Sequence, residues 1–87
     1  MRRLTEEKVK AATMASLTEW PESEWWRGYA VGLRGVDVHD AVLRGCAHQK
    51  PGGDRGRKAR GQGYLDGLAA VVDGKPRFWT SDMEDWS

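Results

Sequence analysis

The sequence feature that most constrains the fold is a six-residue motif, G-Y-x-x-G-L, that occurs twice. The first copy is Gly28-Tyr29-Ala30-Val31-Gly32-Leu33, and the second is Gly63-Tyr64-Leu65-Asp66-Gly67-Leu68. A glycine inside a helix costs roughly 0.5–1 kcal/mol relative to alanine, so four such positions are tolerated only where close packing compensates. The two glycines of each copy are four residues apart and share one helix face beside a Tyr/Leu ridge. The motif therefore predicts two helices packed closely as a hairpin.

A chain of 87 residues with 39% hydrophobic side chains has room for one small core. We expect a single all-α domain over residues 1–80, with three or four helices built on the glycine-mediated hairpin, followed by an acidic tail at residues 81–87. Capping and termination signals place the helices from Thr5 to about Leu17, from the Trp20–Ser23 hinge to Gly35, from Val38 to about His48, and from about Arg57 to Gly74. Residues 49–56 carry no apolar periodicity and predict a loop.

The spacing of apolar residues indicates which side chains face the core. Trp25, Tyr29 and Leu33 recur every four residues, which places them on the inner face of the second helix. Adjacent Trp25 and Trp26 lie about 100° apart on a helix, so we expect one of the two to be exposed. The other helices are expected to direct sparser sets toward the core: Val9, Ala12, Leu17 and Trp20 from the first, and Val38, Ala41, Val42 and Cys46 from the third.

The segment that follows the fourth helix leaves alternatives open. A β-hairpin over residues 71–79 would turn at Asp73-Gly74, and Pro76 weakens it by removing a backbone donor. Trp79 and Trp86 either fold back over the tryptophans of the second helix or stay exposed as contacts for a partner.

The net charge of +1 conceals a basic centre. Arg55, Arg57, Lys58 and Arg60 lie within six residues, and Arg44 and Lys50 lie just upstream. Such a cluster on a glycine-rich loop and helix start can bind phosphates through arginine forks, while nearby aromatic rings stack on unpaired bases. The alternative interpretation is a solvated helix start that keeps the protein soluble. Four cations at the positive end of a helix oppose its dipole, which favours a compensating anion.

The chain carries none of the motifs that indicate catalysis or metal binding. His39, Cys46 and His48 are its soft metal-ligand candidates, and their spacing is not that of a zinc site. There is no nucleophile elbow, Walker loop or H-E-x-x-H motif. We expect no enzyme activity, no metal and no cofactor. No apolar run approaches the roughly 20 residues of a membrane span, so we expect a cytoplasmic protein without a membrane partner.

The segment from Arg27 to Gly35, R-G-Y-A-V-G-L-R-G, resembles the R-G-Y-x-x-G-x-x-G signature of the ribosome modulation factor family, small helical hairpin proteins of bacteria and their phages. The second half of that signature, a glycine followed by an aromatic residue and a small residue one turn on, is matched by Gly63, Tyr64 and Gly67. The chain departs from the pattern at Cys46, which is followed by alanine where the family has proline, and at Tyr64, where the family has tryptophan. The resemblance implies a helical hairpin that docks on the ribosome.

Two functional hypotheses follow. The first is a non-catalytic regulator that docks on a ribosome or another RNA-containing particle. The alternative is a phage-encoded inhibitor, such as an anti-CRISPR or another counter-defence factor, that binds a host protein complex. The candidate nucleic-acid or partner-binding residues are Arg44, Lys50, Arg55, Arg57, Lys58, Arg60, Trp26, Trp79 and Trp86. The structural motif comprises Gly28, Tyr29, Gly32, Gly35, Gly63, Tyr64 and Gly67.

Overall fold

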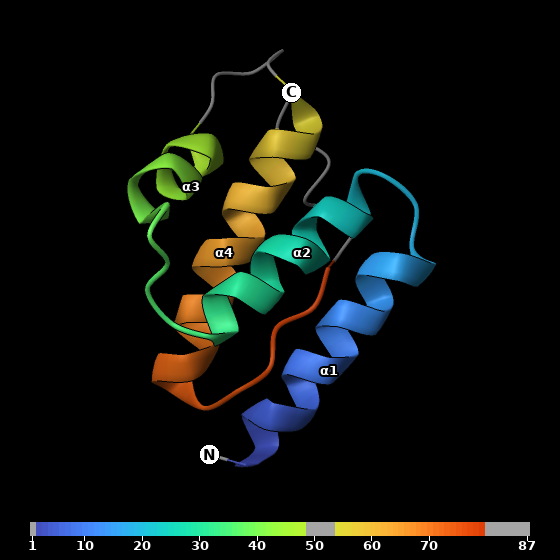
Figure 1. The fold of residues 1–87 in the computed structure, drawn as a ribbon, viewed down its shortest axis with the longest axis vertical. Coiled ribbons are helices and arrows are strands. Elements are labelled where there is room, and N and C mark those ends of the chain that lie inside the picture. Colours follow the sequence, from blue (N-terminus) through green and yellow to red (C-terminus); the bar gives the residue numbers. More distant parts are fainter. Residues whose placement is uncertain (1, 49–53, 80–87) are drawn as a thin grey trace.

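The computed structural model describes residues 2–48 and 54–79, with side chains from residue 6 onward, and the described residues form four helices and no strand. They are α1 (Arg2–Leu17), α2 (Glu22–Leu33), α3 (Asp40–Ala47) and α4 (Arg55–Asp73). α2 and α4 pack against each other at the centre, α1 covers the outer side of α2, and α3 lies against α4 on the opposite side (Figure 1). The predicted all-α fold and the hairpin of the second and fourth helices are confirmed.

The glycines of the duplicated motif allow α2 and α4 to touch backbone to backbone. A Cβ atom added to Gly32 would lie 2.8 Å from the Cα of Gly67, and one added to Gly67 would lie 2.8 Å from the Cα of Gly32. A Cβ on Gly28 would lie 2.8 Å from the carbonyl carbon of Arg60, and one on Gly63 would lie 2.9 Å from that of Trp25. Because each obstacle is backbone, no rotamer change can relieve it. The glycines are therefore required by the close approach of the two helices.

Helix termini agree with the sequence signals in part. Gly35 (φ 102°) and Gly74 (φ 70°) adopt the left-handed conformation expected after α2 and α4. α4 begins at Arg55 rather than Arg57, because Asp54 caps it by accepting hydrogen bonds from the backbone N–H groups of Gly56 and Arg57 at 2.9 and 3.2 Å. α1 starts before the predicted cap at Thr5, and α3 starts at Asp40, two residues after the predicted Val38.

The expectation that either Trp25 or Trp26 is exposed was wrong, since the two side chains are only 0% and 3% exposed. Each indole has a carboxylate partner, because Trp25 Nε1 donates to Asp66 Oδ2 and Trp26 Nε1 donates to Glu22 Oε2, both at 2.9 Å. α1 covers this side of α2 with Ala11, Met14 and Ala15. Trp26 is therefore a core residue and is not available as a contact for a partner.

Residues 75–79 form an irregular segment that runs between α1 and α2, and the alternative β-hairpin is wrong for this part of the chain (Figure 1). The Arg77 backbone N–H donates to the Tyr29 hydroxyl at 2.8 Å, and the Arg77 guanidinium pairs with Asp73 at 2.7 Å. Trp79 packs against Trp25 with ring centroids 6.3 Å apart. The alternative in which Trp79 folds back over the second helix is confirmed. Lys50, Trp86 and the predicted acidic tail lie outside the described residues.

The predicted inner faces of the first and third helices need correction. Val38 and Val42 are 93% and 58% exposed, and Ala41 is also exposed. α3 instead turns Leu43 and Ala47 toward α4, where a Cβ on Gly61 would lie 2.5 Å from the Leu43 carbonyl oxygen. The buried face of α3 therefore lies one residue further along the sequence than expected, about 100° around the helix. In α1 the core residue is Ala11, and the expected core residues Val9, Ala12, Leu17 and Trp20 are exposed.

Candidate nucleic-acid interface

The close crossing of α2 and α4 brings together two arginines that are far apart in the sequence. Gly28 of α2 lies directly against the backbone of Arg60 in α4, so the side chain of neighbouring Arg27 emerges beside that of Arg60. Both guanidinium groups approach Glu24, the Arg60 group at 2.7 Å and the Arg27 group at 3.6 Å. Glu24 is largely covered, with 17% of its side chain exposed, whereas both arginines remain about half exposed. One carboxylate therefore positions two guanidinium groups.

Glu24 cannot satisfy both arginines. A carboxylate offers about four acceptor positions, whereas two guanidinium groups carry about ten N–H donors. The group of three side chains retains a net charge of +1 and several donors that face solvent. An arrangement of this kind, with planar donors held in place, suits an anion that accepts two hydrogen bonds from each fork.

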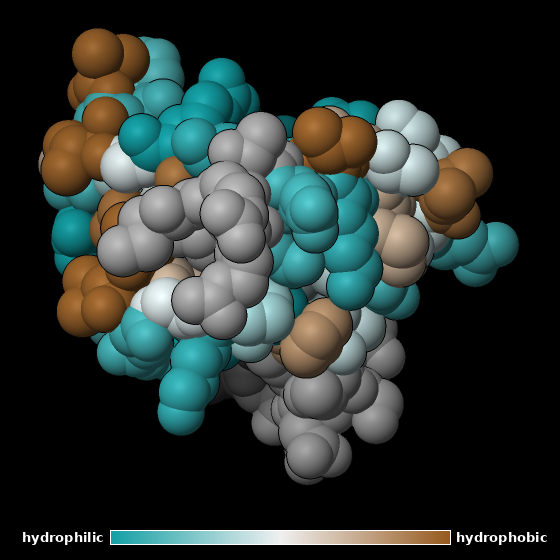
Figure 2. Space-filling model, turned by 90° about the horizontal axis from the view of Figure 1, so that it is seen from below, coloured by the Kyte–Doolittle hydropathy of each residue, from teal (hydrophilic) through white to brown (hydrophobic). Residues whose placement is uncertain are grey.

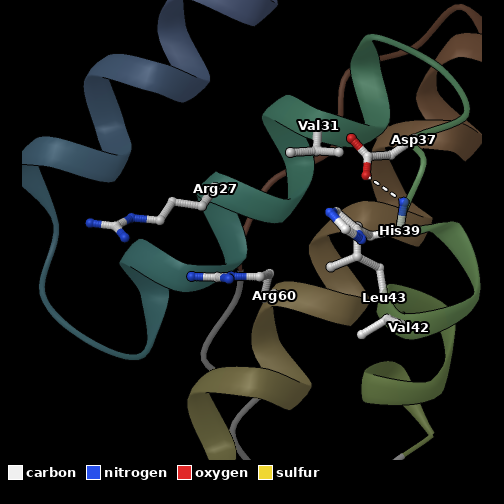
Figure 3. A pocket seen from close by; sticks show the side chains of 7 residues that line it. All are labelled: Arg27, Val31, Asp37, His39, Val42, Leu43 and Arg60. Carbon is white, nitrogen blue, oxygen red and sulfur yellow. Dashed lines mark hydrogen bonds between the residues drawn. The ribbon is translucent and has the colours of Figure 1, made fainter.

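A hollow of about 300 Å³ opens next to these arginines, between α2, α3 and α4. Its lining combines positive, apolar and acidic side chains: Arg27, Val31, Asp37, His39, Val42, Leu43 and Arg60. Figure 3 shows the Arg27 and Arg60 side chains extending the same way from α2 and α4, while His39 and the apolar residues of α3 lie at the other end. Asp37 is engaged within the turn, because its Oδ1 accepts a hydrogen bond from the His39 backbone N–H at 2.8 Å.

A second, shallower hollow of about 250 Å³ adjoins the first along α3. Val42, Gly45, Cys46 and Arg57 line it, and Val42 belongs to both hollows. Arg57 is therefore on the same flank of the molecule as Arg60, as expected for side chains three residues apart on a helix. We call Arg27, Arg57 and Arg60 together the arginine edge.

The second copy of the motif fixes α3 at this flank. The hydroxyl of Tyr64 donates to Asp40 at the start of α3 and accepts from the backbone N–H of Asp37 at 3.3 Å. The Tyr64 hydrogen bond, with that of Arg44 at 2.8 Å, holds the pKa of Asp40 below its usual value. Burial and the neighbouring carboxylate raise the pKa of Tyr64. The tyrosine therefore remains a neutral donor that ties the turn and α3 to α4.

The predicted basic cluster divides into two faces of α4. Arg57 lines the hollow beside α3 and Arg60 pairs with Glu24 of α2, whereas Arg55 and Lys58 occupy the face that the helical repeat places on the other side. The Arg55 guanidinium lies 5.7 Å from the ring centroid of Trp20, in the connection between α1 and α2. Arg44 is on α3 and pairs with Asp40 at 2.8 Å. Part of the positive charge is thus compensated within the protein, by Asp54 at the cap, by Glu24 and by Asp40.

The sequence prediction missed two members of this surface, Arg27 and Trp20. Arg27 is the first residue of the R-G-Y segment, and its position three residues after Glu24 is the signal that it lies on the same helix face. Trp20 was assigned to the core, yet it is 56% exposed. Pro21 directly after it is buried, and it separates Trp20 from the inner face of α2.

Among the described residues no group of three His, Cys, Asp or Glu side chains could hold a metal ion, and Cys46 is a half-buried free thiol. None of the helices described is both long and apolar enough to cross a membrane. A comparison with protein-family models finds no matching family, and comparisons with curated proteins and with solved structures find no match either.

Proposed function

We propose that this protein is a non-catalytic docking protein of the cytoplasm that binds a ribosome or another RNA-containing particle through the arginine edge. The observation that carries the proposal is the convergence of Arg27, Arg57 and Arg60 from two helices onto one flank. The resemblance of residues 27–35 to the ribosome modulation factor signature favours the same function, because its glycines create the crossing that brings Arg27 beside Arg60.

Phosphate is the ligand whose chemistry fits the arginine edge best. A guanidinium fork donates two parallel hydrogen bonds to a phosphate, and it does so more strongly than a neutral donor. Because Glu24 fixes two of the forks in advance, less side-chain entropy is lost on binding. Most contacts of proteins with nucleic acids go to phosphate and sugar, and they position the protein on its partner. The arginine edge is suited to this positioning role.

The salt dependence of RNA binding tests the proposal. Each phosphate contact on a single strand releases counterions, so three contacts predict a slope of roughly 2 in log affinity against log salt, from about 0.7 per contact. Binding of a fluorescent single-stranded oligoribonucleotide is measured at three salt concentrations. Replacing the arginine edge with glutamine is expected to flatten the slope and to abolish co-sedimentation with ribosomes.

The matched control removes the same charge elsewhere on the surface. Lys8→Gln, Arg34→Gln and Lys75→Gln together lower the net charge by the same amount at exposed positions outside the arginine edge. This variant is expected to keep most of the affinity and the slope. If the two triple variants lose the same factor of RNA affinity, only the overall charge matters, and the proposal is contradicted.

A second candidate function, inhibition of a host protein complex, is favoured by exposed valines. Val36 and Val38 are more than 80% exposed, and they flank Asp37 in the sequence, which lines the hollow beside α3 together with Val42. In Figure 2 apolar atoms stand out along the left edge, the side on which α3 and the end of α4 lie in Figure 1. Exposed apolar groups of this kind mark protein-binding surfaces. A phage-encoded inhibitor such as an anti-CRISPR would use them.

Val38→Lys separates the two candidates. A protein-binding inhibitor would lose its partner, and its binding would depend weakly on salt and survive nuclease treatment. A protein that docks through the arginine edge would keep its affinity for RNA, because the added charge is positive and the replaced side chain makes no buried contact.

A further inference from the structure

Trp20 and Arg55 form a half-exposed aromatic and cationic pair at the start of α4. The Arg55 guanidinium lies 5.7 Å from the centroid of the Trp20 ring, within the range of a cation–π contact. With 56% of its surface exposed, Trp20 is one of the few large aromatic side chains outside the core. It belongs to no part of the packing that holds α2 against α4.

One edge of the Trp20 ring packs against the backbone of α4. Gly56 is buried beneath it, and a Cβ atom on Gly56 would lie 3.2 Å from Cε2 of Trp20 and closer still to the indole nitrogen. The indole edge therefore rests against the first turn of α4, at a position that carries no side chain. Gly56 is itself fixed by the Asp54 cap, whose carboxylate accepts its N–H at 2.9 Å. Trp20 is thus both positioned and accessible.

We propose that Trp20 and Arg55 form a stacking site for an unpaired nucleobase of the RNA that the arginine edge binds. This inference rests on the proposed function and adds a base contact to its phosphate contacts. Unpaired bases stack on aromatic rings and on guanidinium planes, and the pair offers both.

The site lies close enough to the arginine edge to serve the same strand. Arg60 of the arginine edge pairs with Glu24, which follows Trp20 by four residues, and Arg55 precedes Arg60 by five residues, about 7.5 Å along the helix axis. A base on Trp20 and phosphates on the arginine edge therefore belong to one short stretch of single strand. Stacking is largely independent of base identity, because every base presents a π face. The site thus selects unpaired RNA over duplex RNA without selecting a sequence.

Two RNA probes separate stacking from phosphate binding. The first is an oligoadenylate of about ten nucleotides, and the second is an abasic ribose-phosphate oligomer of the same length and charge. Trp20→Ala is expected to weaken binding of the oligoadenylate about 5- to 150-fold, the range measured for loss of one stacked base. It is expected to leave binding of the abasic oligomer unchanged. Trp20→Phe, which keeps an aromatic face, should retain most of the affinity.

Phe78 provides the matched control. It is 52% exposed, and Lys10 lies 4.7 Å from its ring centroid, so it is a second aromatic and cationic pair, located beside α1. Phe78→Ala should leave the affinity for both probes unchanged. Two results would overturn the stacking site. The first is that Trp20→Ala binds the oligoadenylate with the affinity of the parent, and the second is that it loses the same factor of affinity for both probes. If the parent protein binds neither the probes nor ribosomes, the proposed function fails and the stacking site fails with it.

Discussion

Replacing Gly32 with alanine tests the packing that organises the molecule, because two opposing effects predict opposite signs. Alanine inside a helix is more favourable than glycine by about 1 kcal/mol, so helix propensity alone predicts a more stable protein. The structure predicts the reverse. The new Cβ would lie 2.8 Å from the Cα of Gly67 and 2.9 Å from the backbone nitrogen of Leu68, where ordinary contacts begin at 3.4 Å.

The expected loss of stability follows from the distance that is missing between the new Cβ and the backbone of α4. α2 and α4 must separate by more than about 0.6 Å at this point, since 3.4 Å is needed, 2.8 Å is available at the Cα of Gly67, and the carbonyl oxygen of Tyr64 lies closer still. A gap of this size forfeits a quarter to a half of the dispersion energy of the atoms that it parts. Overpacking costs about 1–3 kcal/mol where side chains can adjust. Here all three nearest obstacles, on Tyr64, Gly67 and Leu68, are backbone atoms, so the cost lies at the upper end and exceeds the propensity gain. We expect a net loss of roughly 2 kcal/mol.

Thermal unfolding followed by circular dichroism measures this loss. A change of 1 kcal/mol shifts the melting temperature of so small a domain by about 4–8 °C, so Gly32→Ala should melt roughly 10 °C lower than the parent. Gly45→Ala is the control. Gly45 is exposed in α3 with nothing within 4 Å of an added Cβ, and this variant should melt a few degrees higher. A Gly32→Ala protein as stable as the parent would refute the argument for close packing.

Three further changes have expected outcomes. Asp66→Ala leaves the buried Trp25 indole N–H without its acceptor, so the free energy of unfolding should fall by about 1–3 kcal/mol in urea titrations, and Asp66→Asn should recover part of it. Burial raises the pKa of Tyr29 above its usual 10.0. The folded state therefore holds this proton more tightly, and melting temperatures should be constant up to about pH 10 and fall as the pH rises through the raised pKa, less steeply in Tyr29→Phe. Cys46→Ser should keep the fold and RNA affinity, and chelators should not change its melting temperature; metal bound at unit stoichiometry would contradict this.

The helical hairpin could be predicted because it depends on a local rule with a repeated signal. Four glycines at helical spacing are costly unless a second backbone replaces the missing side chains, and Gly28, Gly32, Gly63 and Gly67 all lie at that contact. Gly61 serves the same purpose between α4 and α3. The sequence does not indicate this contact, because the partners of Gly61 on α3 include Leu43 and Ala47 and no glycine, so no glycine motif is repeated there.

The errors concern burial, which depends on elements that pack from outside a helix. Adjacent Trp25 and Trp26 cannot both face one neighbour, and this led to the expectation that one is exposed. They are both buried because the core cluster around them draws residues from α1, from α4 and from the segment after α4, among them Ala11, Ala59 and Trp79. Val42 was assigned to the inner face of its helix from spacing alone. The face that packs on α4 instead carries Leu43 and Ala47, each one residue after an expected position and so about 100° around the helix.

The candidate site was predicted in its charge but not in its shape. The sequence identified Arg57 and Arg60 as part of a basic cluster. It could not show that Glu24 holds Arg60 and Arg27 together, because that contact spans 36 residues. The exposed position of Trp20 could not be predicted for the same reason. Its contact with Gly56 depends on how α4 approaches the connection between α1 and α2.

An NMR titration tests the central claim, that RNA binds at the arginine edge, most directly. Backbone and side-chain N–H signals of the labelled protein are followed while a single-stranded oligoribonucleotide is added. We predict saturable shifts at the guanidinium Nε–H groups of Arg27, Arg57 and Arg60 and at the indole N–H of Trp20, with little change at Val9 and Phe78. Shifts confined to α1 and residues 75–79, or no saturable shift at all, would contradict the account.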